Sequence, residues 1–159
     1  IKRSLTDGGI RVPFIAWWPG RVKPGGETGH VAYFGDWMAT AAELSGAALP
    51  PERDSISLVP VLLGSGGQRE HEFLYWEFHE GGFKQAALYK GRWKGIRAGG
   101  PEAPVRLYDQ QNDVSELTDV AARYPEIADK IGDYLRSART ESPEWQPVWC
   151  ASGKKAKKN

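Results

Sequence analysis

The chain has 159 residues, of which 40% are hydrophobic and 26% charged, a composition typical of a folded globular protein rather than a disordered one. Its 21 basic and 20 acidic residues give a net charge of +1, so no global field attracts nucleic acid or a membrane surface, and any anion must be bound locally. No apolar run approaches the roughly 20 residues that a membrane-spanning helix needs, and the single cysteine, Cys150, excludes an internal disulfide.

The N-terminal region combines a lysine, Lys2, with a glycine turn and the most apolar stretch of the chain. Asp7-Gly8-Gly9 can turn the chain sharply because glycine accepts positive φ without steric cost. Residues 12–18 are a continuous apolar run, which predicts a strand buried on both faces. Because the first residue is isoleucine rather than methionine, we expect the chain to be the C-terminal part of a longer protein.

A helix is predicted between Asp36 and Gly46. Asp36 is expected to cap its N-terminus, apolar residues recur at helical spacing along it, and Gly46 occupies the position where a left-handed residue commonly ends a helix. The glycine-rich residues 65–68 then predict a flexible linker and a domain boundary.

From residue 72 onward the sequence alternates as strands do and is rich in aromatic residues. Four short strands are predicted, at residues 73–78, 85–89, 92–97 and 105–108. Lys90-Gly91 has the length and glycine placement of a two-residue hairpin turn. A helix should begin at Pro125, because Ile127, Ile131 and Leu135 form an apolar stripe. Strands followed by one helix predict a small α+β unit.

The order of residues resembles that of the sulfatase family. Lys2 and the sequence KRSLTDGGIRVPFIAWWPG match the family's K-x-x-x-x-[DE]-G-G-x-R-V-P…W-P-G block, which lies in the second half of its catalytic domain. The sequence DSISLVPVLLG is similar to the segment that closes that domain. The order YWEF, QAALYKGRWKGIR, LYD and a helix resembles the family's C-terminal subdomain, a four-stranded antiparallel sheet covered by a helix.

The resemblance covers nearly residues 1–140 and implies three parts. Residues 1–66 would be the end of an α/β, alkaline-phosphatase-like catalytic domain. Residues 67–142 would be the α+β subdomain with the four-stranded antiparallel sheet, and residues 143–159 a flexible basic tail.

The resemblance also implies an activity, hydrolysis of sulfate esters. Family enzymes use a formylglycine, made from cysteine or serine in C/S-x-P-x-R, beside a calcium or magnesium ion. Neither site is present in this sequence: Cys150 lacks the proline and arginine of that motif, and the metal ligands are expected upstream of Lys2. Lys2 corresponds to a sulfate-binding lysine, whose ammonium stabilises the charge that builds as the S–O bond breaks. The chain alone is expected to be inactive.

A substrate-binding role is a second hypothesis for Glu77, His79 and Lys84. His79 ends an aromatic strand, and loop ends carry function more often than strand centres. An exposed strand end without a role is the more favoured alternative.

Two other functions stay open at this point. One is a non-catalytic module that binds a sulfated glycan through the aromatic sheet and its basic residues, Lys84, Lys90, Lys94 and Arg97. The other is a phospho- or phosphonate-monoester hydrolase of the same superfamily, because one lysine cannot distinguish sulfate from phosphate. The expected partner is a sulfated small molecule or glycan, with no nucleic acid and no membrane. The resemblance implies a periplasmic or secreted location, and an unpaired strand at residues 12–18 would favour self-association.

Overall fold

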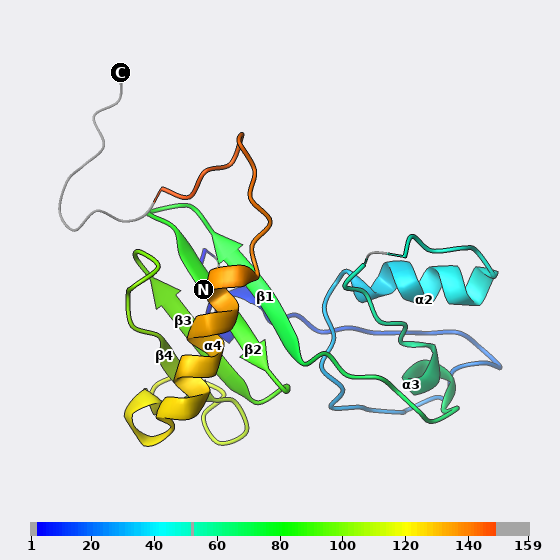
Figure 1. Cartoon of the computed structure of the whole chain (residues 1–159). Helices are drawn as coiled ribbons and strands as arrows, with labels where there is room; N and C mark the ends of the chain where they lie inside the picture. Colours follow the sequence, from blue (N-terminus) through cyan, green and yellow to red (C-terminus); the bar gives the residue numbers. More distant parts are fainter. Residues whose placement is uncertain (1–2, 52, 149–159) are drawn as a thin grey trace. The chain divides into compact units, whose positions relative to one another are not determined.

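The computed structural model describes residues 3–51 and 53–148 (Figure 1). Its contacts divide the chain into two compact units, one formed by Val12–Glu72 and the other by Ile1–Arg11 together with Phe73–Asn159. We call them the helical unit and the sheet unit. The division falls at residues 12 and 73, whereas the sequence predicts a boundary at residues 65–68. The short segment before Val12 therefore groups with the sheet.

The sheet unit is built on a four-stranded antiparallel sheet, as the sequence predicts. Its strands lie in the order β1-β2-β3-β4, so each pairs with its neighbour in the chain (Figure 1). They are β1 (Phe73–Phe78), β2 (Lys84–Tyr89), β3 (Trp93–Ala98) and β4 (Arg106–Asp109). Because side chains alternate along a strand, the sheet presents two faces with different neighbours.

The hairpin between β2 and β3 is one residue longer than predicted. Lys90 and Gly91 have positive φ values of 49° and 64°, and the Arg92 N–H donates to the Tyr89 carbonyl at 3.1 Å. The first paired residues are Tyr89 and Trp93, which leaves three residues between the strands rather than two. The Arg92 carbonyl accepts from the Gln110 N–H, next to the start of the β3–β4 pairing, rather than joining the β2–β3 ladder.

Helix α4 (Pro125–Ser137) covers one face of the sheet (Figure 1) and follows a short 3₁₀ turn, η1 (Ala121–Arg123). The predicted stripe is confirmed, since Ile131 and Leu135 are buried against Trp93 and Leu107. The helix lies very close to β3: a Cβ placed on Gly95 would be 2.5 Å from Ile131 Cγ2. Only glycine at this position permits such an approach.

The opposite face of the sheet is covered by the N-terminal segment, residues 3–11, which includes the single turn α1 (Asp7–Ile10). Leu5 is buried there against Ala86, Ile96 and Tyr108. The sequence gives no indication of this packing, because the segment and the sheet are far apart in the chain.

The helical unit contains α2 (Asp36–Ser45) and α3 (Val59–Leu63). Helix α2 ends at Gly46 with φ 72°, as predicted, but Gly35 is its N-cap and Asp36 is its first residue. Asp36 is fully buried, and its carboxylate accepts hydrogen bonds from Tyr33 N–H and Ile56 N–H. It also lies 2.9 Å from His71 Nε2, so its role is to tie loops to the helix rather than to cap it.

The prediction of a buried strand at residues 12–18 is wrong for this structure. The run forms no strand, and Val12, Ile15 and Trp17 are 78%, 88% and 85% exposed. A strand buried on both faces needs a paired strand beside it and layers above and below it. Among the described residues no strand pairs with this run, although the Phe14 ring lies 6.4 Å from that of Trp37. The α/β character predicted for residues 1–66 is therefore not seen among the described residues. None of the helices in the described part is long and apolar enough to cross a membrane.

Candidate functional site

Lys2, the predicted sulfate-binding residue, lies outside the described residues. The segment that follows it is held on the sheet by a buried charged cluster, which we call the Lys94 cluster and define as Lys94, Asp7 and Glu116. Lys94 Nζ lies 2.6 Å from Asp7 Oδ1 and 3.2 Å from Glu116 Oε1, and the lysine side chain is only 1% exposed. Its ammonium also lies 5.5 Å from the centre of the Trp76 ring.

Further hydrogen bonds fix the geometry of this cluster. Glu116 Oε2 accepts from the Asp7 N–H at 2.9 Å, and Glu116 Oε1 accepts from Gln110 Nε2 at 2.7 Å. Glu116 itself has a positive φ of 54°, which is uncommon for a residue with a side chain and brings its carboxylate back over the sheet. The cluster thus joins three segments that are distant in the sequence.

Glu77 and His79 are brought together at the end of β1. His79 Nε2 lies 3.2 Å from Glu77 Oε1, and the second carboxylate oxygen accepts from Tyr75 Oη at 3.0 Å. Arg139, whose side chain is 7% exposed, places its Nε 3.3 Å from the same oxygen. The Glu77 carboxylate is therefore contacted by Tyr75, His79 and Arg139. Its contact with His79 Nε2 orients the imidazole ring.

A buried polar chain supports this pair from beneath. Gln85 Nε2 donates to Tyr75 Oη at 2.9 Å, and Gln85 Oε1 accepts from Arg97 Nη2 at 2.6 Å. Burial raises the pKa of Tyr75 to about 12, with a hydrogen bond to Glu77 adding to the effect and the one from Gln85 opposing it. The phenol is neutral at physiological pH and donates to Glu77.

Lys84 does not join Glu77 and His79. It pairs with Phe78 across β1 and β2, and its Nζ lies 5.9 Å from the centre of the Phe78 ring, on the other face of the sheet. The structure therefore brings together two of the three residues predicted to bind substrate.

The basic residues assigned to a sulfated-glycan module are not a common surface. Lys94 is fully buried and Arg97 is 2% exposed. Being three positions apart on one strand, they also point to opposite faces. This alternative loses two of its four cations because both are used inside the fold.

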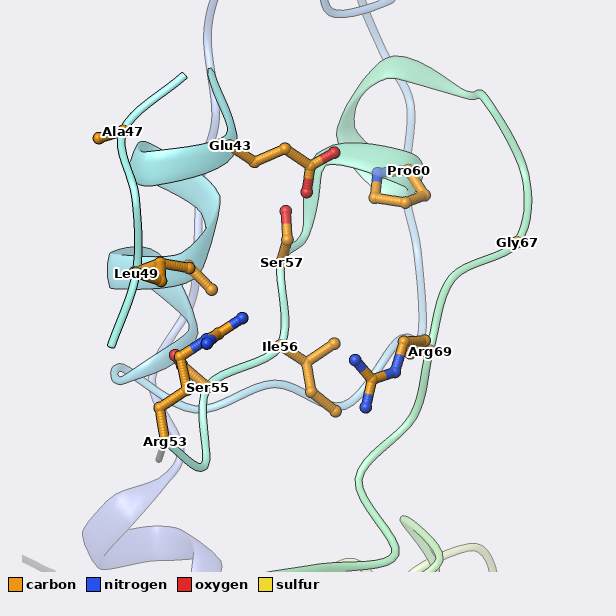
Figure 2. A pocket seen from close by; sticks show the side chains of 11 residues that line it. Glu43, Ala47, Leu49, Arg53, Ser55, Ile56, Ser57, Pro60, Gly67 and Arg69 are labelled. Atoms are coloured by element: carbon orange, nitrogen blue, oxygen red, sulfur yellow. The ribbon is translucent and has the colours of Figure 1, made fainter. Parts of the chain in front are cut away.

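A separate cavity of about 320 Å³ lies in the helical unit (Figure 2). Arg53 and Arg69 reach toward Ile56 from its two sides, and the Glu43 carboxylate is directed toward Ser57. Ser55 Oγ is buried there without a hydrogen-bond partner. Among the described residues that line it, no hydrogen bond joins a hydroxyl to the Glu43 carboxylate, so the cavity holds polar groups without an activated nucleophile.

The metal ligands that the sulfatase resemblance implies are expected upstream of Lys2. Within residues 3–51 and 53–148, no group of three or more His, Cys, Asp or Glu side chains is arranged to hold an ion. The carboxylates of the acidic turn at the end of β4 accept hydrogen bonds from protein groups. Asp109 accepts from Arg92, and Asp113 accepts from the N–H groups of Leu117 and Thr118. These carboxylates are therefore used in hydrogen bonds and an ion pair within the protein. The tail thiol, Cys150, lies outside the described residues.

Comparison with known proteins identifies the family. Residues 1–141 match the family model described as N-sulphoglucosamine sulphohydrolase, C-terminal. The chain belongs to the sulfatase family. It corresponds to the C-terminal portion of these enzymes, which share the alkaline-phosphatase-like fold.

Individual relatives agree with this placement. The sulfatase chain is 32% identical to arylsulfatase K of Mus musculus over 147 residues, which cover 86% of the chain and 26% of that protein. It is 43% identical to steryl-sulfatase of Rattus norvegicus over 76 residues, 46% of the chain and 13% of the relative. A solved structure of a 2-O GAG sulfatase matches with a TM-score of 0.54 and 26% identity, over 65% of the chain and 23% of that protein. The chain thus spans about a quarter or less of these proteins.

Proposed function

We propose that this chain is the C-terminal part of an enzyme that hydrolyses sulfate esters, in which Lys2 binds the sulfate group. The match of residues 1–141 to the sulfatase C-terminal model carries the proposal, because it includes the block that contains Lys2. An ammonium at that position would stabilise the negative charge that develops on the ester oxygens as the S–O bond breaks. The nucleophile and any metal ion belong to residues outside this chain.

The substrate would be a sulfated small molecule or glycan. One structural neighbour is a 2-O GAG sulfatase, which supports a sulfated glycan. We assign Glu77 and His79 to contacts with the organic part of that substrate, because they form a fixed pair at a strand end. Lys84 is the weaker candidate, since it lies on the other face of the sheet. A periplasmic or secreted location remains an expectation from the family.

The test uses the natural protein that contains this chain and an aryl sulfate as substrate. Lys2→Ala should lower kcat/KM by on the order of a hundredfold, the size seen when one charge-stabilising group is removed. Arg3→Ala is the matched control, because Arg3 is also basic but pairs with Glu80 at 3.0 Å on the surface and should have little effect. A Lys2→Ala variant within threefold of the wild type would contradict the assignment.

The 159-residue chain on its own provides the second test. It should show no turnover of an aryl sulfate, because a lysine alone cannot supply the covalent step. Turnover that a chelator leaves unchanged would refute this expectation. Assaying the natural protein on an aryl phosphate as well as an aryl sulfate distinguishes the phospho- or phosphonate-monoester hydrolase alternative, which predicts the higher kcat/KM on phosphate.

A further inference from the structure

We infer that Lys94 and Glu116 are positioning residues for Lys2: they hold Asp7 in place and so fix the start of the chain segment that carries the sulfate-binding lysine. The inference rests on the proposed role of Lys2. Neither residue is expected to touch the substrate, because both are buried, Lys94 within strand β3 and Glu116 beside it.

The contacts hold residues 3–11 in one defined position on the sheet, which non-directional apolar packing alone would not do. Asp7 is held through its carboxylate by Lys94 and through its N–H by Glu116, so both its side chain and its backbone are fixed. The turn that follows is closed by hydrogen bonds from Gly9 N–H to the Thr6 carbonyl and from Arg11 N–H to the Asp7 carbonyl. One attachment holds the side chain of Asp7 and the other its backbone, so together they restrict both the position and the orientation of this residue.

The chemistry of the cluster also favours a positional role over a purely stabilising one. Burying a lysine with two carboxylates incurs a desolvation cost that the ion pairs roughly repay, so apolar residues of the same size would often stabilise the fold as well. What charged and hydrogen-bonded groups add is directionality. Leu5 already supplies apolar contact for this segment, at 5% exposure, but such contact tolerates shifts.

Lys2 is close enough along the chain for this anchor to matter. Asp7, the anchored residue, follows Lys2 by five positions, and five residues can span at most about 18 Å. A displacement of only about 1 Å in a group that binds the reacting part of a substrate can lower the rate a hundredfold. The anchor therefore acts on Lys2 through a short tether.

The experiment compares Glu116→Gln with Glu102→Gln, a matched control that removes one carboxylate charge from an exposed site in the same unit. In the wild type the Glu116 carboxylate faces three donor groups, which belong to Asp7, Gln110 and Lys94. Glu116→Gln puts a neutral amide in its place. Amide exchange on the 159-residue chain should show the N–H groups of Asp7, Gly9 and Arg11 exchanging about tenfold faster, with β2 and β3 unchanged. Unchanged exchange at these amides would overturn the inference.

Kinetics on the natural protein then separate positioning from simple stability. Glu116→Gln should lower kcat/KM for an aryl sulfate about tenfold, and the Lys2→Ala/Glu116→Gln double variant should be no worse than Lys2→Ala alone, because residues that act through one another are not additive. Losses that multiply would show that Glu116 acts independently of Lys2 and would overturn the inference.

The two proposals fail in different ways. A harmful Lys2→Ala with a harmless Glu116→Gln overturns only the positioning role. A harmless Lys2→Ala in an active enzyme, or a natural protein that hydrolyses no sulfate ester, overturns the proposed function and the inference with it.

Discussion

Replacing Lys94 with methionine should strongly destabilise the sheet unit. The change keeps most of the side-chain length but leaves two carboxylates, 2.6 and 3.2 Å from the lost ammonium, without a cation. Removing one partner of a buried ion pair costs about 3–5 kcal/mol. The Glu116 side chain is 2% exposed and cannot recover hydration, whereas Asp7 is 20% exposed and can recover part of it. We therefore expect a loss near the lower limit, about 3 kcal/mol.

The slowest-exchanging amides of β2 and β3 provide the measurement, because they report the free energy of unfolding of this unit. A loss of about 3 kcal/mol should accelerate them more than a hundredfold and lower the Tm of a unit this size by roughly 12–24 °C. Lys90→Met is the control: Lys90 is exposed in the hairpin turn, and its replacement should change stability by less than about 0.5 kcal/mol.

A neutral version of the cluster tests whether charge is the cause. Lys94→Met combined with Asp7→Asn and Glu116→Gln leaves no buried charge without a partner, so most of the stability should return. A triple variant as unstable as Lys94→Met, or a Lys94→Met loss below about 1 kcal/mol, would refute the reasoning from buried charge.

Three further substitutions test other parts of the sheet unit. Gly95→Ala should lower the free energy of unfolding, measured by chemical denaturation, by about 1–3 kcal/mol, because the new methyl would lie 2.5 Å from Ile131 Cγ2. The double variant with Ile131→Ala should lose less than the sum of the two single losses. Two hydrogen bonds from Arg92 are the main reason that the pKa of Asp109 is lowered from 3.8 to about 2. Because the pKa of Asp109 is lower in the folded state, its contribution to the free energy of unfolding is present above pH 3.8 and is lost as the pH falls toward 2. Acid titration should therefore lower the free energy of unfolding of the wild type by up to about 2 kcal/mol, and should not cause this loss in Asp109→Asn. Burial raises the pKa of Tyr75 from 10.0 to about 12. Its contribution to the free energy of unfolding is therefore complete below pH 10 and falls as the pH rises toward 12. The absorbance titration of tyrosine should lose its last step in Tyr75→Phe.

The elements that the sequence predicts well are those whose pattern is local. The alternation in residues 73–78 indicates both strand β1 and its two faces, and the apolar stripe of α4 indicates the side of the helix that packs on the sheet. Gly46 ends α2 because a left-handed residue is required there, which is also a local property. Such signals need no knowledge of the rest of the chain.

The Lys94 cluster and the exposed run illustrate what the sequence does not predict. Asp7 and Lys94 are 87 positions apart, and a lysine in an alternating strand looks like an ordinary surface residue. The apolar character of residues 12–18 indicates a preference for burial, but not which neighbours are available. In both cases the outcome depends on long-range contacts, which periodicity does not encode.

The register of β3 links the two faces of the sheet. Lys94 points to the N-terminal segment and binds Asp7, whereas Arg97 points to the α4 face and binds Gln85, which supports Tyr75 and, through it, Glu77. A shift of one residue in the pairing of β3 would exchange these faces and leave a buried cation on each side without its partner. The hairpin at Lys90 and Gly91 and the close approach of α4 at Gly95 both fix this register. The same alignment therefore determines where the segment after Lys2 is anchored and how the Glu77–His79 pair is supported. One strand thus positions both groups of residues for which we propose a role in binding the sulfate ester.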